Sequence, residues 1–192
     1  GENGKWLLGD IGNQRLREVN MRSGMISTRS GTGERETTPD EAPLEGTPLR
    51  GPRSIDTDER GNAYLVLREG NAVFRLDLQA GRLQRIAGTG ERGLTGDGGQ
   101  AMAATFNGPK GIAYSASDQS LYIVDTENHA IRLIHADTGI VTTIAGGRLG
   151  GEGDGGPATE AAMDRPHGCG IDSDGNIFVA DSNNHRVRVV GV

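Results

Sequence analysis

The sequence predicts an all-β protein, a β-propeller built from four-stranded antiparallel blades. The first observation behind this prediction is a constant internal period, because two series of residues recur every 57 positions: Pro52, Pro109 and Pro166, and Asp40, Asp97 and Asp154. The second is a recurring order of short runs rich in Val, Ile, Leu and Tyr, bounded by Gly, Asn and Asp, which is typical of strands and turns. The third is the glycine content, 32 of 192 residues, which indicates many tight turns.

The segment before the first complete repeat predicts a partial blade over residues 6–30. Its stretch LLGDIGNQRLREV (7–19) matches IVDTENHAIRLI (123–134), which begins at the second strand of its repeat. We therefore expect this blade to lack its first strand. We also expect Trp6, the single tryptophan, to pack between blades.

The two complete repeats predict whole blades over residues 52–88 and 109–146. Their four runs are PRSIDTD, AYLVL, AVFRLDL and LQRIAG in the first, and PKGIAYS, LYIVD, AIRLIHA and VTTIAG in the second. Residues 166–192 supply PHGCGID, IFVAD and RVRVVGV, so we expect a second partial blade without its last strand. Four strands joined in chain order make one propeller blade. Long interblade loops connect the blades over residues 31–51, 89–108 and 147–165.

The last repeat resembles a known family. Residues 166–190, PHGCGIDSDGNIFVADSNNHRVRVV, are similar to an NHL repeat, and residues 109–134 are a second good copy. The insert GDGGPATEAAM (153–163) resembles a subgroup with long interblade loops. Such propellers commonly have six blades, so the resemblance implies that the chain forms two whole and two partial blades of a larger ring. Further residues or further copies would complete that ring, and a closed four-bladed ring is the alternative.

One glycine-rich stretch matches a nucleotide-binding pattern. GTGERG (88–93) has the spacing G-x-G-x-x-G, but that site needs a helix that begins at the last glycine. LTGDGGQ follows instead, and GGRLGGEGDGG breaks the pattern in the next repeat, so we interpret these glycines as turn residues. We expect Asp97 and Asp154 to cap the GDGG turns rather than bind a metal ion.

A pair of charged residues recurs at fixed places in the blades. Each aspartate ends the second strand and each arginine follows seven residues later; the repeat at 52–88 keeps an arginine, Arg75, but has Arg68 where the aspartate is expected. Positions that recur in every blade indicate architecture rather than catalysis, so we expect the aspartates to cap the Asn turns. The arginines would pair with them or with a neighbouring blade. The series comprises Asp10, Asp125 and Asp181 with Arg17, Arg75, Arg132 and Arg188.

The residue after the repeated proline varies between blades, and its position makes it a candidate for binding. It is Arg53, Lys110 or His167, at the start of what should be the innermost strand, where it can face the central channel. These basic groups on a protein of net charge −6 suggest an anion site at the channel mouth, for a carboxylate or a phosphate. The alternative is that all three are solvated or paired with nearby acids.

The same position also raises a metal hypothesis. The fold that the sequence resembles is shared by the peptide-amidating lyases. In those enzymes a histidine follows the proline in several blades, and these histidines converge on a zinc ion, so the resemblance suggests a zinc site here as a hypothesis. Only His167 matches that pattern, and Arg53 and Lys110 are protonated and do not ligate zinc. We therefore predict no metal ligands, no catalytic residues and no cofactor in this part of the ring.

Three functions fit the sequence. The favoured one is a non-catalytic binding scaffold that presents interblade loops and a channel mouth to a protein, a peptide or a small anionic ligand. A metal-dependent enzyme of lyase or lactonase type is the second. A partial propeller that completes a ring through its open blade edges is the third.

The composition of the chain limits the classes of partner that it is expected to bind. The net charge of −6 argues against nucleic acid, and no run approaches the roughly 18 apolar residues that a membrane-spanning helix needs. The single cysteine, Cys169, excludes an internal disulfide and is interpreted as a small buried residue. The compartment is left undecided, with an extracytoplasmic location favoured over a cytoplasmic one.

Overall fold

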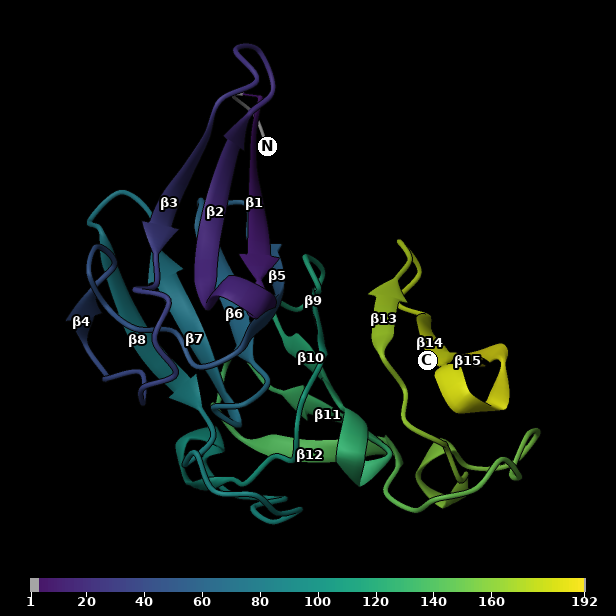
Figure 1. Cartoon of the computed structure of the whole chain (residues 1–192). Coiled ribbons are helices and arrows are strands. Elements are labelled where there is room, and N and C mark those ends of the chain that lie inside the picture. Colours follow the sequence, from purple (N-terminus) through teal and green to yellow (C-terminus); the bar gives the residue numbers. More distant parts are fainter. Residues whose placement is uncertain (1–3, 192) are drawn as a thin grey trace.

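The chain folds into four antiparallel sheets arranged one after another, as the computed structural model in Figure 1 shows. The structure describes residues 4–191. Within them the regular elements are fifteen β-strands and five one-turn 3₁₀ helices. Every strand pairing within the sheets is antiparallel and joins strands that follow one another in the chain, apart from one short strand at the edge of the second sheet.

The first and last sheets have three strands each. The first contains β1 (Lys5–Asp10), β2 (Arg15–Asn20) and β3 (Ile26–Ser30), with the helix η1 (Ile11–Asn13) between the first two. The last contains β13 (Gly168–Ile171), β14 (Ile177–Asp181) and β15 (Arg186–Val190), with η5 (Ser182–Asn184) in the corresponding place.

The two middle sheets have the expected four consecutive strands. The second sheet is formed by β5 (Pro52–Thr57), β6 (Asn62–Leu67), β7 (Ala72–Asp77) and β8 (Arg82–Ala87). The third is formed by β9 (Gly111–Tyr114), β10 (Leu121–Asp125), β11 (Ala130–Ile134) and β12 (Val141–Gly146), with η3 (Thr126–Asn128) after β10.

The interblade segments are not plain loops. In the segment 31–51, β4 (Ala42–Pro43) pairs with β8 as a fifth strand of the second sheet. The next two segments carry the helices η2 (Ala101–Ala103) and η4 (Ala158–Glu160). Each segment also sends one large apolar side chain into the core, since Leu49, Phe106 and Met163 are almost fully buried.

The core lies between successive sheets as three separate layers. Leu16 of the first sheet packs with Leu65 of the second, and Val66, on the opposite face of β6, packs with Ile123 of the third. Val124 of the third sheet packs in turn with Val179 of the last. Since the side chains of a strand alternate between its two faces, each interior sheet contributes to two layers.

The turn after the second strand has the same backbone conformation in all four sheets. Its last residue is left-handed, with φ of 47° to 55°, at Gln14, Asn71, His129 and His185. In the first three sheets a glycine of the outer strand faces this residue: a Cβ at Gly31, Gly88 or Gly146 would collide with its carbonyl oxygen. This contact explains why glycine ends the outer strand of each repeat.

Strand register corrects two of the sequence assignments. Leu67 pairs with Ala72 as Asp125 pairs with Ala130, so Leu67, not Arg68, holds the aspartate position of the second sheet. Phe74, seven residues later, holds the arginine position, and Arg75 points to solvent from the other face. The connection between the first two strands is one residue shorter in this sheet than in the third, and the constant 57-residue period hides that difference.

A third prediction, that Trp6 packs between blades, is wrong, because its side chain is 60% exposed. Trp6 lies on the face of β1 opposite Leu7, and Leu7 is the residue that joins the first core layer. That face of the first sheet has no neighbouring sheet among the described residues (Figure 1).

Candidate functional site: a basic cluster at the inner strands

The first strands of three sheets lie beside one another and bring the candidate binding residues together. β5 contacts β9, and β9 contacts β13, while the outer strands of different sheets diverge. Arg53 is the second residue of β5, and Lys110 and His167 directly precede β9 and β13. The repeated proline therefore places one basic side chain per sheet at the same level of this inner row.

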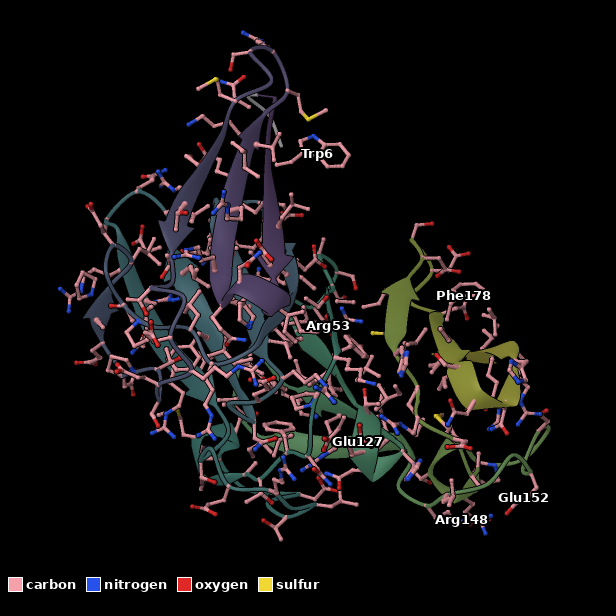
Figure 2. All side chains as sticks on the ribbon, in the orientation of Figure 1. Trp6, Arg53, Glu127, Arg148, Glu152 and Phe178 are labelled. Carbon is pink, nitrogen blue, oxygen red and sulfur yellow. The ribbon has the colours of Figure 1, made fainter. Side chains whose placement is uncertain are left out.

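Two of the three residues touch. The Nζ atom of Lys110 lies 2.8 Å from Nε2 of His167, across the boundary between the third and last sheets. The ammonium can donate to an unprotonated Nε2, which fixes the imidazole as the acceptor. Lys110 is buried, whereas His167 and Arg53 are exposed. Among residues 4–191, no side chain or carbonyl pairs with the Arg53 guanidinium, which is labelled in Figure 2.

Three further charged residues complete the cluster, and sequence reasoning missed them. Arg165 precedes the proline of the last repeat, and its guanidinium lies 2.6 Å from Oε1 of Glu127. The Arg68 guanidinium lies 3.9 Å from the same oxygen. Arg68 and Glu127 both sit in the turn after the second strand, in adjacent sheets. Their meeting depends on how neighbouring sheets pack, which no local pattern encodes.

Positive charge dominates this cluster. Burial lowers the pKa of Lys110 below its ordinary value of 10.5, and the nearby charges of Arg165, Arg68 and Arg53 lower it further, against Glu127. Burial, followed by Lys110, Arg165 and Arg53, likewise lowers the pKa of His167 below 6.5. Glu127 is the acid that opposes these shifts in both cases. The site therefore favours any ligand that brings negative charge.

The recurring aspartate and arginine form buried ion pairs in the last two sheets. In the third sheet, Arg132 lies 3.4 Å from Asp125, and both side chains are fully buried. Arg132 also lies 2.8 Å from Asp97 of the preceding interblade segment and stacks over Phe106. Burial raises the pKa of Asp125 to about 6, against the hydrogen bonds from Asn107 and Asn128 and the charge of Arg132.

The last sheet repeats this arrangement. Arg188 lies 3.7 Å from Asp181 and 2.6 Å from Asp154, which corresponds to Asp97. The prediction that Asp97 and Asp154 serve as turn caps misses their main contact, because each carboxylate pairs with the arginine of the following sheet. The arginine thus ties an interblade segment to its blade.

The first two sheets depart from the pattern. In the second sheet, Leu67 and Phe74 replace the ion pair inside the first core layer. Asp40 consequently pairs with Arg85 of β8 instead, accepting a hydrogen bond from its backbone N–H at 2.7 Å, while the Arg85 guanidinium lies 3.8 Å from the Asp40 carboxylate. In the first sheet, Asp10 bonds to Asn13, and Arg17 donates to Thr28 rather than to Asp10.

Among the described residues, the stretch GTGERG (88–93) lacks the helix of a dinucleotide-binding turn. No helix follows Gly93, since the chain continues as turns up to η2. Burial raises the pKa of the Cys169 thiol to about 12. Across residues 4–191, no group of three or more His, Cys, Asp or Glu side chains is placed to hold a metal ion. No helix in this range is long and apolar enough to cross a membrane.

The chain is similar to NHL-repeat proteins. The NHL repeat family model matches residues 106–132 and 163–190. The plant protein SUPPRESSOR OF QUENCHING 1, chloroplastic, of Arabidopsis thaliana is 30% identical over 98% of this chain. NHL repeat-containing protein 2 of Gallus gallus is 26% identical over 96% of it. The chain spans only 18% and 26% of the lengths of these two relatives.

Solved structures share the fold at low sequence identity. An auxiliary nutrient binding protein from Bacteroides thetaiotaomicron superposes with a TM-score of 0.70 at 23% identity, over 98% of this chain and 45% of that one. A streptogramin B lyase superposes with a TM-score of 0.63 at 11% identity, over 100% of this chain and 52% of that one. These likenesses confirm the all-β propeller fold. The family model and the named relatives support the NHL repeat family for this chain.

Proposed function

We propose that this chain is part of a binding scaffold, an NHL-type β-propeller that holds an anionic group at its inner strands. The ligand would be a small anion or an acidic group of a protein or peptide. The observation that carries the proposal is the contact between Lys110 and His167, with Arg53 on the next inner strand free of any partner in the described part of the chain. Two basic side chains held in contact are stabilised when a negative charge joins them.

The roles of the three residues follow from their chemistry. The planar guanidinium of Arg53 can donate two parallel hydrogen bonds to a carboxylate or a phosphate. Lys110 supplies a point charge, fixed in direction by burial and by its contact with His167. A bound anion would raise the pKa of His167, because it offsets the positive charges of Lys110, Arg165 and Arg53 that help to lower it.

Isothermal titration with inorganic phosphate tests this site. We expect Arg53→Ala and Lys110→Ala each to weaken phosphate binding by about tenfold, the effect of losing one charge-assisted hydrogen bond. Arg75→Ala is the matched control, because it removes the same charge from an exposed position on β7. Unchanged affinity in both site variants, or an equal loss in the control, would show that no such site exists.

A second proposed role, assembly into a larger ring, is favoured by the two end faces. On β1, Trp6 and Leu8 point away from the core, and on the last sheet Phe178, Val187 and Val189 do the same. Figure 2 shows Trp6 and Phe178 on the first and last sheets. These faces correspond to the ones that pack sheet on sheet elsewhere in the chain, and exposed apolar patches of this kind mark interaction surfaces.

Light scattering tests the assembly role. If copies of the chain associate through these faces, Phe178→Asp should shift the molecular mass toward that of one chain. Leu149→Asp is the control, because Leu149 is also an exposed apolar residue, 64% against 41% for Phe178, but lies on an interblade segment. A six-bladed ring and membership of the long-loop NHL subgroup are part of this proposal. The long interblade inserts support the subgroup, because Asp97 and Asp154 of these inserts each pair with an arginine of the next sheet. A mass of one chain for the unaltered protein at all concentrations would argue against copies assembling.

A metal-dependent enzyme of lyase or lactonase type is the catalytic alternative. Its support is His167, which follows the repeated proline at the inner strands, together with the fold that the chain shares with a lyase. Elemental analysis of the purified protein, in parallel with His167→Ala, separates the two functions. A stoichiometric metal lost in the variant favours the enzyme over the anion-binding scaffold.

A further inference from the structure

Lys110 is one of two lysines in the sequence, and the two lie in contrasting environments. The side chain of Lys5, on β1, is 51% exposed, and its ammonium pairs with Glu18 at 2.9 Å. Lys110 is 9% exposed and pairs with no carboxylate among residues 4–191. Its Nζ atom has one hydrogen-bond partner there, Nε2 of His167. The cluster therefore holds a buried lysine without a counter-charge in contact, and Lys5 is an exposed reference for it.

The surroundings of Lys110 favour its neutral amine. An ammonium is costly to bury without an ion partner, and burial is the main cause that lowers the pKa of Lys110 below 10.5. The charges of Arg165, Arg68 and Arg53 lower it further, whereas Glu127 acts in the other direction. A lysine that is desolvated beside other cations is an activated nucleophile, because its nitrogen keeps a free electron pair. Lys110 is thus better prepared to react than Lys5.

We propose that Lys110 is a carbamylation site, at which the ε-amine adds carbon dioxide and becomes a lysine carbamate. The Nζ electron pair forms a bond to the carbon of CO₂, one C–O π pair becomes a lone pair of a carboxylate oxygen, and Nζ gives up one proton. Nε2 of His167, 2.8 Å from Nζ, is placed to accept this proton and, because His167 is exposed, to pass it to water. The products are one carbamate anion and one proton.

The basic groups that disfavour the ammonium stabilise the carbamate. The reaction replaces a positive charge by a negative one, and nearby opposite charges favour the ionised form of a group. Arg53 has no partner among residues 4–191, so its guanidinium is free to donate two parallel hydrogen bonds to a carboxylate. Arg165 and Arg68 share Oε1 of Glu127, on η3, at 2.6 and 3.9 Å. Glu127 therefore competes with the carbamate for these two guanidinium groups.

Carbamylation would also regulate the anion site, and this consequence rests on the proposed function. The carbamate places a negative charge where Lys110 would otherwise offer a positive one to the ligand. Like charges at one site disfavour each other, so phosphate and the carbamate should exclude one another. Carbon dioxide would thus convert the cluster from a form that holds an anion to a form that rejects it.

Carbon-13 NMR of the whole chain in labelled bicarbonate, at mildly alkaline pH, tests the modification. Trapping with a trialkyloxonium salt followed by peptide mapping assigns the labelled amine. We expect Lys110 to carry at least about tenfold more carbamate than Lys5, the effect that one nearby opposite charge has on an ionisation equilibrium. Lys110→Arg keeps the charge and should abolish this signal. Equal labelling of the two lysines, or an unchanged signal in Lys110→Arg, would overturn the proposal.

Variants with opposite expected effects separate the proposal from simple misfolding. Arg53→Ala should lower the carbamate level about tenfold, whereas Arg75→Ala, the same change at an exposed position of β7, should leave it unchanged. Glu127→Gln should raise the level about threefold, the range of a partly exposed ion pair, because it frees Arg165 and Arg68. A level that Glu127→Gln lowers or leaves unchanged would contradict the role of the arginines and overturn the proposal.

Phosphate distinguishes a failure of this proposal from a failure of the proposed function. Added phosphate should reduce the carbamate signal of Lys110, because both need the same positive charges. A carbamate on Lys110 that phosphate does not reduce would refute the phosphate site and leave the modification standing. Phosphate binding in calorimetry, with no carbamate on Lys110 in bicarbonate, would overturn the modification and leave the phosphate site standing.

Discussion

Arg132 shows how one side chain can join a sheet to the segment that precedes it. Its guanidinium is fully buried and pairs with Asp125 in its own sheet and with Asp97 in the interblade segment. Removing one member of a buried pair leaves an uncompensated charge, whereas replacing both with apolar residues can be nearly neutral. The second sheet contains the apolar version of the same pair, Leu67 and Phe74.

The ion pair gives the first prediction. Arg132→Ala should lower the free energy of unfolding by about 3–5 kcal/mol, because the Asp125 carboxylate stays buried without its partner. The double variant Asp125→Leu with Arg132→Phe copies the second sheet and should stay within about 2 kcal/mol of the unaltered protein. Urea unfolding measures both. A double variant less stable than Arg132→Ala would contradict this account of the repeat.

Gly146 gives the second prediction at the residue scale. Its φ of 74° strains any larger residue, and a Cβ there would collide with the His129 carbonyl oxygen. Gly147 shares the positive φ, at 101°, but has open space around it. The backbone strain is common to both positions, so the steric overlap should make Gly146→Ala more destabilising than Gly147→Ala by about 1–3 kcal/mol, the usual cost of overpacking. Equal melting temperatures for the two variants would count against the close contact.

At the scale of elements, the interblade segments act as edge strands. Gly98 and Gly99 cover the outer edge of β12, and Asp97, next to them, is anchored by Arg132. Asp97→Ala should therefore speed hydrogen exchange of the Val141 amide, which donates to Gly99. The amides of β9, at the inner edge of the same sheet, serve as the internal control. An unchanged Val141 rate would show that Asp97 does not hold this segment in place.

The sequence was sufficient to predict the strands because each sheet is a local unit of four runs joined by short turns. It was not sufficient for the register of the second sheet. The connection between β5 and β6 is one residue shorter than its counterpart in the third sheet, so Arg75 lies on the solvent face and not at the arginine position. The inner positions of Arg53, Lys110 and His167 follow from the repeat alone. Arg165 and Glu127 join the cluster through packing between sheets, which a single sequence does not encode.

On the scale of the whole molecule, the four sheets form a row with an apolar face at each end. Trp6 is exposed because its face of β1 has no neighbouring sheet in the described structure. The expectation that it packs between blades assumed a partner sheet on that side. The same row brings β5, β9 and β13 together, so that the charges of separate repeats act on one another.

The shared electrostatics make stability and binding depend on pH in opposite directions. The folded chain holds the pKa of His167 below its ordinary value of 6.5, so protonation favours the unfolded state. The free energy of unfolding should therefore be unaffected by the titration of His167 above pH 6.5. It should decrease as the pH falls from 6.5 toward the lowered pKa that His167 has in the folded chain. Affinity for sulfate, an anion whose charge does not change in this range, should rise over the same window, and His167→Ala should reduce both slopes in paired calorimetric and urea titrations.

The convergence of the inner strands on one basic cluster is the central claim, and an NMR titration of the His167 ring tests it most directly. We predict a pKa below 6.5 in the unaltered chain, a higher pKa in Lys110→Ala, and a higher pKa when phosphate is present. A His167 pKa at or above 6.5 that neither Lys110→Ala nor phosphate changes would contradict the account.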